Sequence, residues 1–125
     1  MPNTAEIAQQ LVAHCQAHTE AQGLQELYHP EAVSVEAMGP PGMDLEMTGL
    51  EAIQGKHEWW AANFEEHEVT VDGPYVNGNN FSVVFEMDVT EKSSGNRMQM
   101  KEVALYSVAD GKIVREEFQM KPMEG

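Results

Sequence analysis

Three short turn signals divide the second half of this sequence into extended segments. They are Asn77-Gly78-Asn79, Ser94-Gly95-Asn96 and Asp110-Gly111. Glycine beside asparagine, aspartate or serine is typical of the tight turns that join antiparallel strands. The residues around these turns, from Glu68 to Met120, are therefore predicted to form an antiparallel meander.

The first half has helical periodicity instead. Apolar residues recur at helical spacing from about Thr4 to Gln16, with Asn3 or Thr4 as N-cap and Glu6 in the first turn. A shorter helix is predicted from Glu20 to Tyr28, and a third from Gly49 to about Phe64. Helices followed by a meander indicate an α+β fold.

Two shorter strands are expected between the second and third helices. Ala32 to Glu36 alternates, with Val33 and Val35 on one face, and Leu45 to Thr48 is a weaker candidate. Ala32 and Ser34 are small, so a strand-end carboxylate at Glu36 has room beside it for a ligand.

Length and charge limit the classes of function. A chain of 125 residues fits one domain, residues 1–125. With 21 acidic residues against 7 lysines and arginines, the net charge of -14 argues against nucleic acid and membrane surfaces as partners. Cys15 is the lone cysteine, and the polar start at Asn3 does not resemble a signal peptide, so a cytoplasmic location is expected.

Turn geometry predicts which residues share a sheet face. With Asp110-Gly111 as a two-residue hairpin, Tyr106 pairs with Arg115, and Glu102 pairs with Gln119. One face then carries Phe81, Val83, Phe85, Met87, Val89, Met100, Glu102, Ala104, Tyr106, Val108, Ile113, Arg115, Glu117 and Gln119. This face is the better core candidate, and its mixture of apolar and acidic side chains is typical of a ligand pocket.

The preceding strand has two possible assignments of its inward face. The same alternation sends Thr70 and Asp72 inward, unless a bulge at Gly73-Pro74 reverses it.

The third helix has an apolar stripe of Ile53, His57, Trp60, Ala61 and Phe64. Trp59 and Trp60 are successive, so they cannot both face inward.

The chain resembles a known family over most of its length. The segments from Leu27 to Glu36, from Gly49 to Lys56 with Trp59-Trp60, and from Asp110 to Val114 are similar, in this order, to a SnoaL-like domain of the nuclear-transport-factor-2-like superfamily. The resemblance implies a cone: helices packed on a strongly curved, mostly antiparallel sheet around an internal pocket. It also implies a homodimer through the outer face of the sheet.

The superfamily includes polyketide cyclases, ketosteroid isomerases, dehydratases, epoxide hydrolases and non-catalytic binding modules. By resemblance, the isomerases' general base falls at Glu36, and their partner aspartate falls near Ala104 or Glu102. The cyclases' late acidic residue falls near Glu117 or Gln119. The isomerases' helix tyrosine falls near Val12 or His14, so that hydrogen-bond donor is missing here.

These observations predict a pocket for a small apolar or aromatic carbonyl compound, with cofactor-independent isomerase, cyclase or dehydratase chemistry. The candidate catalytic residues are Glu36, as the candidate general base, and Glu102 and Glu117, as polar groups opposite it. The candidate substrate-binding residues are His57, Trp60, Phe85, Met87, Met100, Tyr106 and Gln119. Neither a metal nor an organic cofactor is expected. The alternative is a non-catalytic ligand-binding or dimeric interaction module of the same fold.

Overall fold

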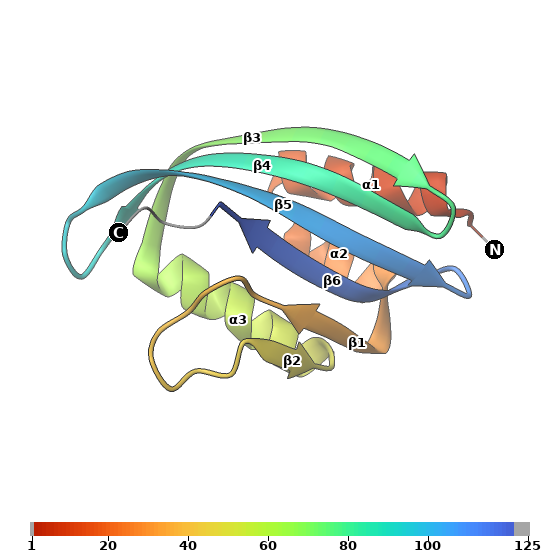
Figure 1. Cartoon of the computed structure of the whole chain (residues 1–125), viewed down its shortest axis with the longest axis horizontal. Coiled ribbons are helices and arrows are strands. Elements are labelled where there is room, and N and C mark those ends of the chain that lie inside the picture. The colour runs from red at the N-terminus through yellow and green to blue at the C-terminus, as the bar shows by residue number, and fades with distance from the viewer. Residues whose placement is uncertain (1, 122–125) are drawn as a thin grey trace.

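The computed structural model describes residues 2–121, which form three helices and six strands (Figure 1). The helices are α1 (Thr4–Ala17), α2 (Glu20–Leu27) and α3 (Leu50–Asn63). The strands are β1 (Tyr28–Val35), β2 (Glu46–Thr48), β3 (Phe64–Asn77), β4 (Asn80–Glu91), β5 (Arg97–Ala109) and β6 (Lys112–Met120). This order confirms the predicted α+β class.

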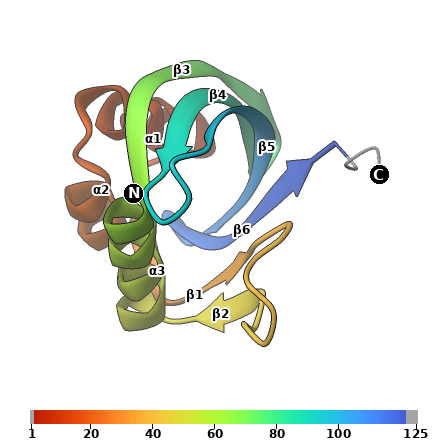
Figure 2. The same ribbon diagram turned by 90° about the vertical axis from the view of Figure 1, so that its left-hand side faces the viewer.

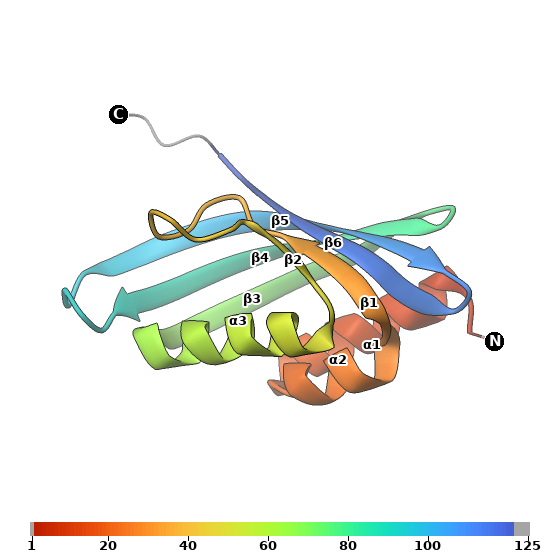
Figure 3. The ribbon, with the colours of Figure 1, turned by 90° about the horizontal axis from the view of Figure 1, so that it is seen from below.

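The strands form one sheet in the order β2-β1-β6-β5-β4-β3, in which β1 and β6 are parallel and all other neighbours are antiparallel. Figure 2 shows that the sheet curves strongly from β3 to β6. All three helices lie on one side of it, the concave side (Figure 3). The curvature confirms the predicted cone-like arrangement of helices on a curved sheet.

Helix α1 begins with a reciprocal cap. The Asn3 side chain accepts a hydrogen bond from the backbone N–H of Glu6, and the Glu6 side chain accepts one from the backbone N–H of Asn3. The apolar face of the helix is buried, with Ile7 fully covered and Leu11 nearly so. Burial of each such side chain contributes about 2 kcal/mol, so the cap and the apolar stripe together fix α1 against the sheet.

The concave face of β4 and β5 carries the core, as predicted. Phe81, Val83 and Ala104 are buried there, and the rings of Phe81 and Tyr106 stack with their centroids 4.6 Å apart. A two-residue hairpin at Ser94-Gly95 predicts that Phe85 pairs with Ala104, whereas in the structure Phe85 pairs with Glu102, a register difference of two residues. A shift of two preserves the side-chain alternation, so the predicted face survives.

The prediction for β6 is wrong by one residue. Asp110 and Gly111 have positive φ angles of 51° and 76°, as a two-residue hairpin turn requires, and Ala109 pairs with Lys112 as predicted. The register then shifts, because Val108 pairs with Ile113 whereas Ser107 pairs with Arg115. Val114 is the extra residue of this bulge.

The bulge reverses the faces of the rest of β6. Tyr106 pairs with Glu116 rather than with Arg115, and Glu102 pairs with Met120 rather than with Gln119. Arg115, Glu117 and Gln119 therefore lie on the outer face, and Glu116, Phe118 and Met120 lie on the concave face. The residue after a classic bulge changes sides because side chains alternate with a period of two.

Strand β3 contains the bulge at Gly73-Pro74 that the sequence offered as an alternative. Its register shifts between Asp72 and Tyr75, around Gly73-Pro74. As a result Val69 and Val71 pack against the core, and Thr70 and Asp72 lie outside.

Among residues 2–121, no helix is long and apolar enough to cross a bilayer.

Candidate functional site

The concave face has a fully buried end and an open end. At the buried end, α1 and α2 cover Phe81, Val83 and Tyr106. At the open end, several inward-facing side chains are only half-buried: Glu36, Met87, Met98, Met100, Glu102 and Met120. The carboxyl groups of Glu36 and Glu102 therefore lie at the more accessible end of the concave face.

Lys56 is the centre of a network of polar side chains. Its Nζ lies 2.8 Å from Glu36 Oε1 and 3.5 Å from Glu116 Oε1, and it donates a hydrogen bond to Ser34 Oγ. The Phe118 ring lies beneath it, with 4.7 Å between Nζ and the ring centroid. The side chain is only 9% exposed. Burial of a lysine is tolerated when its charge is paired in this way.

Glu116 fixes the deep side of this network. Its side chain is 2% exposed and accepts hydrogen bonds from the Tyr28 hydroxyl and, over 2.8 Å, from Ser34 Oγ. Burial, followed by the neighbouring Glu116 carboxylate, raises the pKa of Tyr28 well above its ordinary value, so the hydroxyl keeps its proton and donates. We call Tyr28, Ser34, Glu36, Lys56 and Glu116 the Lys56 network.

Glu102 is the carboxyl group outside the network. No hydrogen bond or ion pair joins its side chain to another residue within 2–121, and its cross-strand neighbours are Phe85 and Met120. Burial and the carboxylates of Glu36 and Glu116 raise the pKa of Glu102 and Lys56 lowers it, and together they bring it to about 7. A carboxyl group with this pKa exchanges a proton readily at neutral pH.

Two further polar groups lack partners. Tyr106 is 3% exposed, its hydroxyl makes no hydrogen bond to another described residue, and burial raises its pKa well above the ordinary value. The Nδ1 atom of His57 is buried without a partner, and burial lowers the pKa of this ring, which favours its neutral form. A buried polar group without a partner loses about 1–3 kcal/mol relative to one that is hydrogen-bonded, so the Nδ1 atom of His57 favours a ligand that supplies the bond.

The other predicted site residues lie in three places, namely the concave face, helix α3 and the outer face. Phe85, Met87 and Met100 lie on the concave face, and Trp60 stacks on Phe64 with the ring centroids 4.2 Å apart. Trp59 is 39% exposed, so it is the tryptophan at the helix edge.

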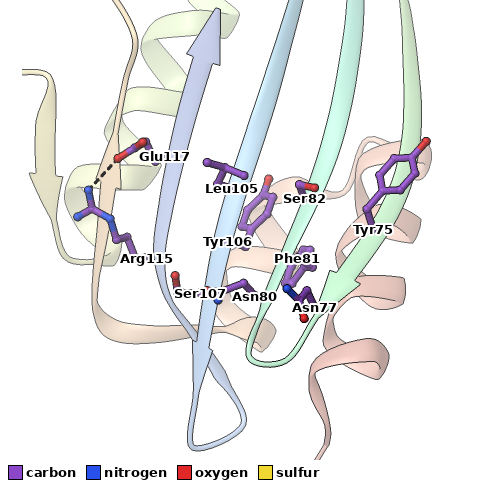
Figure 4. Close-up of a pocket in the computed structure, with 10 residues that line it drawn as sticks. All are labelled: Tyr75, Asn77, Asn80, Phe81, Ser82, Leu105, Tyr106, Ser107, Arg115 and Glu117. Carbon is purple, nitrogen blue, oxygen red and sulfur yellow. Dashed lines mark hydrogen bonds and ion pairs between the residues drawn. The ribbon is translucent and has the colours of Figure 1, made fainter.

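Glu117 and Gln119 lie on the outer face and do not meet the other candidates. Glu117 Oε1 is 2.9 Å from the guanidinium of Arg115, and Gln119 donates a hydrogen bond to Glu117. The hydrogen bond from Arg115 lowers the pKa of Glu117. Both residues of the ion pair line an outer-face hollow of about 370 Å³, together with Leu105 and Tyr75 (Figure 4).

Sequence reasoning missed four members of the Lys56 network. Lys56 follows the fully buried Ile53 by three residues, which places both on one side of α3, and this spacing was the available signal. Glu116 was missed because the Val114 bulge, which turns it to the concave face, was not predicted. Tyr28 and Ser34 were missed because they are the hydrogen-bond partners of Glu116. Within residues 2–121, no three histidine, cysteine, aspartate or glutamate side chains are arranged to hold a metal ion.

Comparison with solved structures supports the fold. A protein from Mesorhizobium loti, named as a SnoaL-like polyketide cyclase with carbohydrate phosphatase in brackets, is 38% identical with a TM-score of 0.88, over 94% of this chain and 99% of that one. An NTF2-like protein from Burkholderia thailandensis is 17% identical with a TM-score of 0.83, over 97% and 92% of the two chains. One from Pseudomonas putida, named as a polyketide cyclase, is 14% identical with a TM-score of 0.73, over 97% and 93%.

These structures confirm the predicted nuclear-transport-factor-2-like fold. Among curated proteins, none matches the chain. A family model described as a SnoaL-like domain matches residues 2–120. The chain therefore belongs to the SnoaL-like domain family.

Proposed function

We propose that the concave face binds a small neutral carbonyl compound and catalyses a proton transfer at the carbon next to its carbonyl group. The observation that carries the proposal is the position of Glu102, a half-buried carboxyl group with no hydrogen bond or ion pair to another described residue, near a network in which Glu36 and Glu116 are paired with Lys56. The names of the polyketide cyclases that share the fold agree with carbonyl chemistry.

The charges of the site favour a neutral ligand. Glu36, Glu102 and Glu116 contribute three carboxyl groups, and Lys56 is paired with Glu36 and Glu116. An incoming carboxylate or phosphate would meet like charges and no uncommitted cation. A ketone or aldehyde carries no charge and can accept a hydrogen bond from Tyr106.

The proposed reaction needs one acid–base group and one hydrogen-bond donor. The ionised Glu102 removes a proton from the carbon beside the carbonyl, and the electron pair of that C–H bond moves through the new C–C double bond onto the carbonyl oxygen. The Tyr106 hydroxyl donates to this developing oxyanion. Protonated Glu102 then returns the proton to a different carbon, so the reaction is an isomerisation without net gain or loss of protons.

The test uses a β,γ-unsaturated cyclic ketone, whose conversion to the conjugated isomer is followed by ultraviolet absorption. We expect Glu102→Gln to lower the rate about a hundredfold or more, because the amide cannot accept the proton. Glu86→Gln is the matched control, since Glu86 lies on the outer face of the neighbouring strand and is 60% exposed.

Two outcomes would contradict the proposal. If wild type and Glu102→Gln convert the ketone at the same rate, Glu102 is not the acid–base group. If the ketone binds and neither protein converts it, the alternative of a non-catalytic ligand-binding module is favoured.

A further inference from the structure

We propose that Lys56 is a positioning residue, which holds Glu36 and Glu116 with its ammonium group and so leaves Glu102 as the carboxyl group that exchanges the proton with the substrate. This inference rests on the proposed function and adds how the site gives its carboxyl groups different roles. Lys56 itself does not touch the substrate in this scheme.

The first support is the number of donors on Lys56. A lysine ammonium group has three N–H bonds. Three oxygen atoms surround it: Ser34 Oγ, Glu36 Oε1 at 2.8 Å and Glu116 Oε1 at 3.5 Å. The Phe118 ring covers a further side at 4.7 Å. These three oxygen atoms equal the N–H bonds of Lys56 in number, and none of them belongs to Glu102.

The second support is that the surroundings of Lys56 keep its ammonium group in place. Lys56 extends from α3 next to the fully buried Ile53, which anchors this part of the helix on the core. On the deep side, Glu116 is held by Tyr28 and Ser34. To reach Glu102, Lys56 would have to leave two carboxylates and a hydroxyl, and breaking a buried ion pair is costly.

The third support is the arrangement of Glu36 and Glu102 about Phe118. Glu36 is the first residue after β1, and the last residue of β1, Val35, pairs with Glu117 of β6. Phe118 is the next residue on β6, and it pairs with Ala104, two positions from Glu102 on the same face of β5. Glu36 and Glu102 thus belong to the two segments on either side of β6, and Lys56 lies over the Phe118 ring and pairs with Glu36.

The arrangement gives two carboxyl groups in one site different roles. Glu36 has a cationic partner at ion-pair distance, whereas Glu102 has apolar cross-strand neighbours and no such partner among residues 2–121. Pairs of carboxyl groups whose environments differ in this way are the usual basis of acid–base assignment. The charged groups that act on Glu102 from neighbouring elements are Glu36, Glu116 of β6 and Lys56 of α3.

The test measures the titration of Glu102 by carboxyl-carbon NMR, with assignment from Glu102→Gln, and the pH profile of ketone isomerisation in parallel. The variants are Glu36→Gln, Lys56→Met and Lys56→Arg, and Glu86→Gln is the control. Glu36→Gln keeps the shape of the side chain at a partly exposed position, so it remains informative if Lys56→Met does not fold.

We expect opposite shifts from the two main variants. In Glu36→Gln the midpoint of Glu102 falls by about half a unit or more, because a neighbouring negative charge is lost. In Lys56→Met the midpoint rises by a similar amount, because the positive charge is lost. The midpoint of the pH profile moves with the NMR midpoint in each variant, and Lys56→Arg restores the wild-type profile.

A purely structural role gives a different result. Lys56→Met would then lower the rate equally at every pH, and neither variant would displace the midpoint of Glu102; that result would overturn the inference. The proposed function fails separately, when Glu102→Gln retains the wild-type rate while the NMR shifts still occur.

Discussion

The Tyr28 hydroxyl donates a hydrogen bond to Glu116, a residue 88 positions later in the chain, and this bond joins the start of β1 to the middle of β6. Tyr106 faces the same carboxylate from β5, since it pairs with Glu116 in the sheet. Its hydroxyl has no partner among the described residues, although Tyr106 is as buried as Tyr28. The two tyrosines thus have equal burial and different bonding.

Replacing each tyrosine by phenylalanine tests this difference. We expect Tyr28→Phe to lower the free energy of unfolding by about 1–3 kcal/mol, because Glu116 loses a buried hydrogen bond. We expect Tyr106→Phe to leave the free energy of unfolding within about 0.5 kcal/mol of wild type and to lower the rate of ketone isomerisation about a hundredfold. Urea denaturation and the isomerisation assay measure both quantities. Equal losses of stability in the two variants would contradict the assignment of Tyr106 as a ligand donor.

The pKa of Glu102 predicts how stability depends on pH. It rises from an ordinary value of 4.5 to about 7 in the folded chain. The folded state therefore binds more protons than the unfolded state between these values, and the stability contributed by protonated Glu102 is lost as the pH rises through about 7. We expect Glu102→Gln to unfold at the same urea concentration as wild type at pH 4.5 and to be more stable at pH 8, on the order of 2 kcal/mol.

Glu86→Gln is again the control, because Glu86 is 60% exposed on the outer face. If Glu102→Gln followed the same pH dependence as wild type, the carboxyl group of Glu102 would not be desolvated in solution.

The sequence contained enough information for the fold and for half of the site. Period-two alternation placed Phe85, Glu102 and Tyr106 on one face, and a register error of two residues did not disturb this result. The faces of β6 depended instead on one extra residue, Val114, which has no special turn chemistry. Its bulge is selected by the tertiary structure, since it places Glu116 beside Tyr28 and Ser34 and leaves Glu117 outside.

Deleting Val114 removes the extra residue of the bulge and leaves a regular two-residue hairpin. Val108 then still pairs with Ile113, Ser107 with Arg115 and Tyr106 with Glu116, so Glu116 and Phe118 keep their positions on the concave face. We therefore expect the deletion variant to unfold in a cooperative thermal transition, as Val114→Ala does. Loss of the cooperative transition in the deletion variant alone would contradict the role given to Val114 as the extra residue that sets the faces of β6.

The preference for neutral ligands can be measured with compounds of similar shape. Acetophenone and benzoate share a phenyl ring, but benzoate carries a negative charge at neutral pH. Because Lys56 is committed to Glu36, Ser34 and Glu116, benzoate would approach the site without an available cation. We expect NMR titration to give at least tenfold weaker binding for benzoate, about 1.4 kcal/mol or more. Tighter binding of benzoate would contradict the charge argument.

The predicted homodimer is testable through the outer face of the sheet. The chain has a net charge of -14, so two copies repel one another over most of their surfaces. On the outer face, however, three ion pairs balance charge locally: Asp88–Arg97, Glu86–Lys101 and Arg115–Glu117. Leu105 lies among them and is 39% exposed. This face is the one on which a second copy would meet apolar side chains and paired charges.

We expect light scattering to give twice the 13.9 kDa of the chain. Leu105→Glu adds a carboxylate to each copy at the centre of the face, where the copies would place like charges close together, and it should shift the mass to that of a monomer. Ala62→Glu adds the same charge at an exposed position of α3 and should leave the dimer intact. A wild-type mass of one chain would contradict the dimer. Equal masses for wild type and Leu105→Glu would place the interface elsewhere.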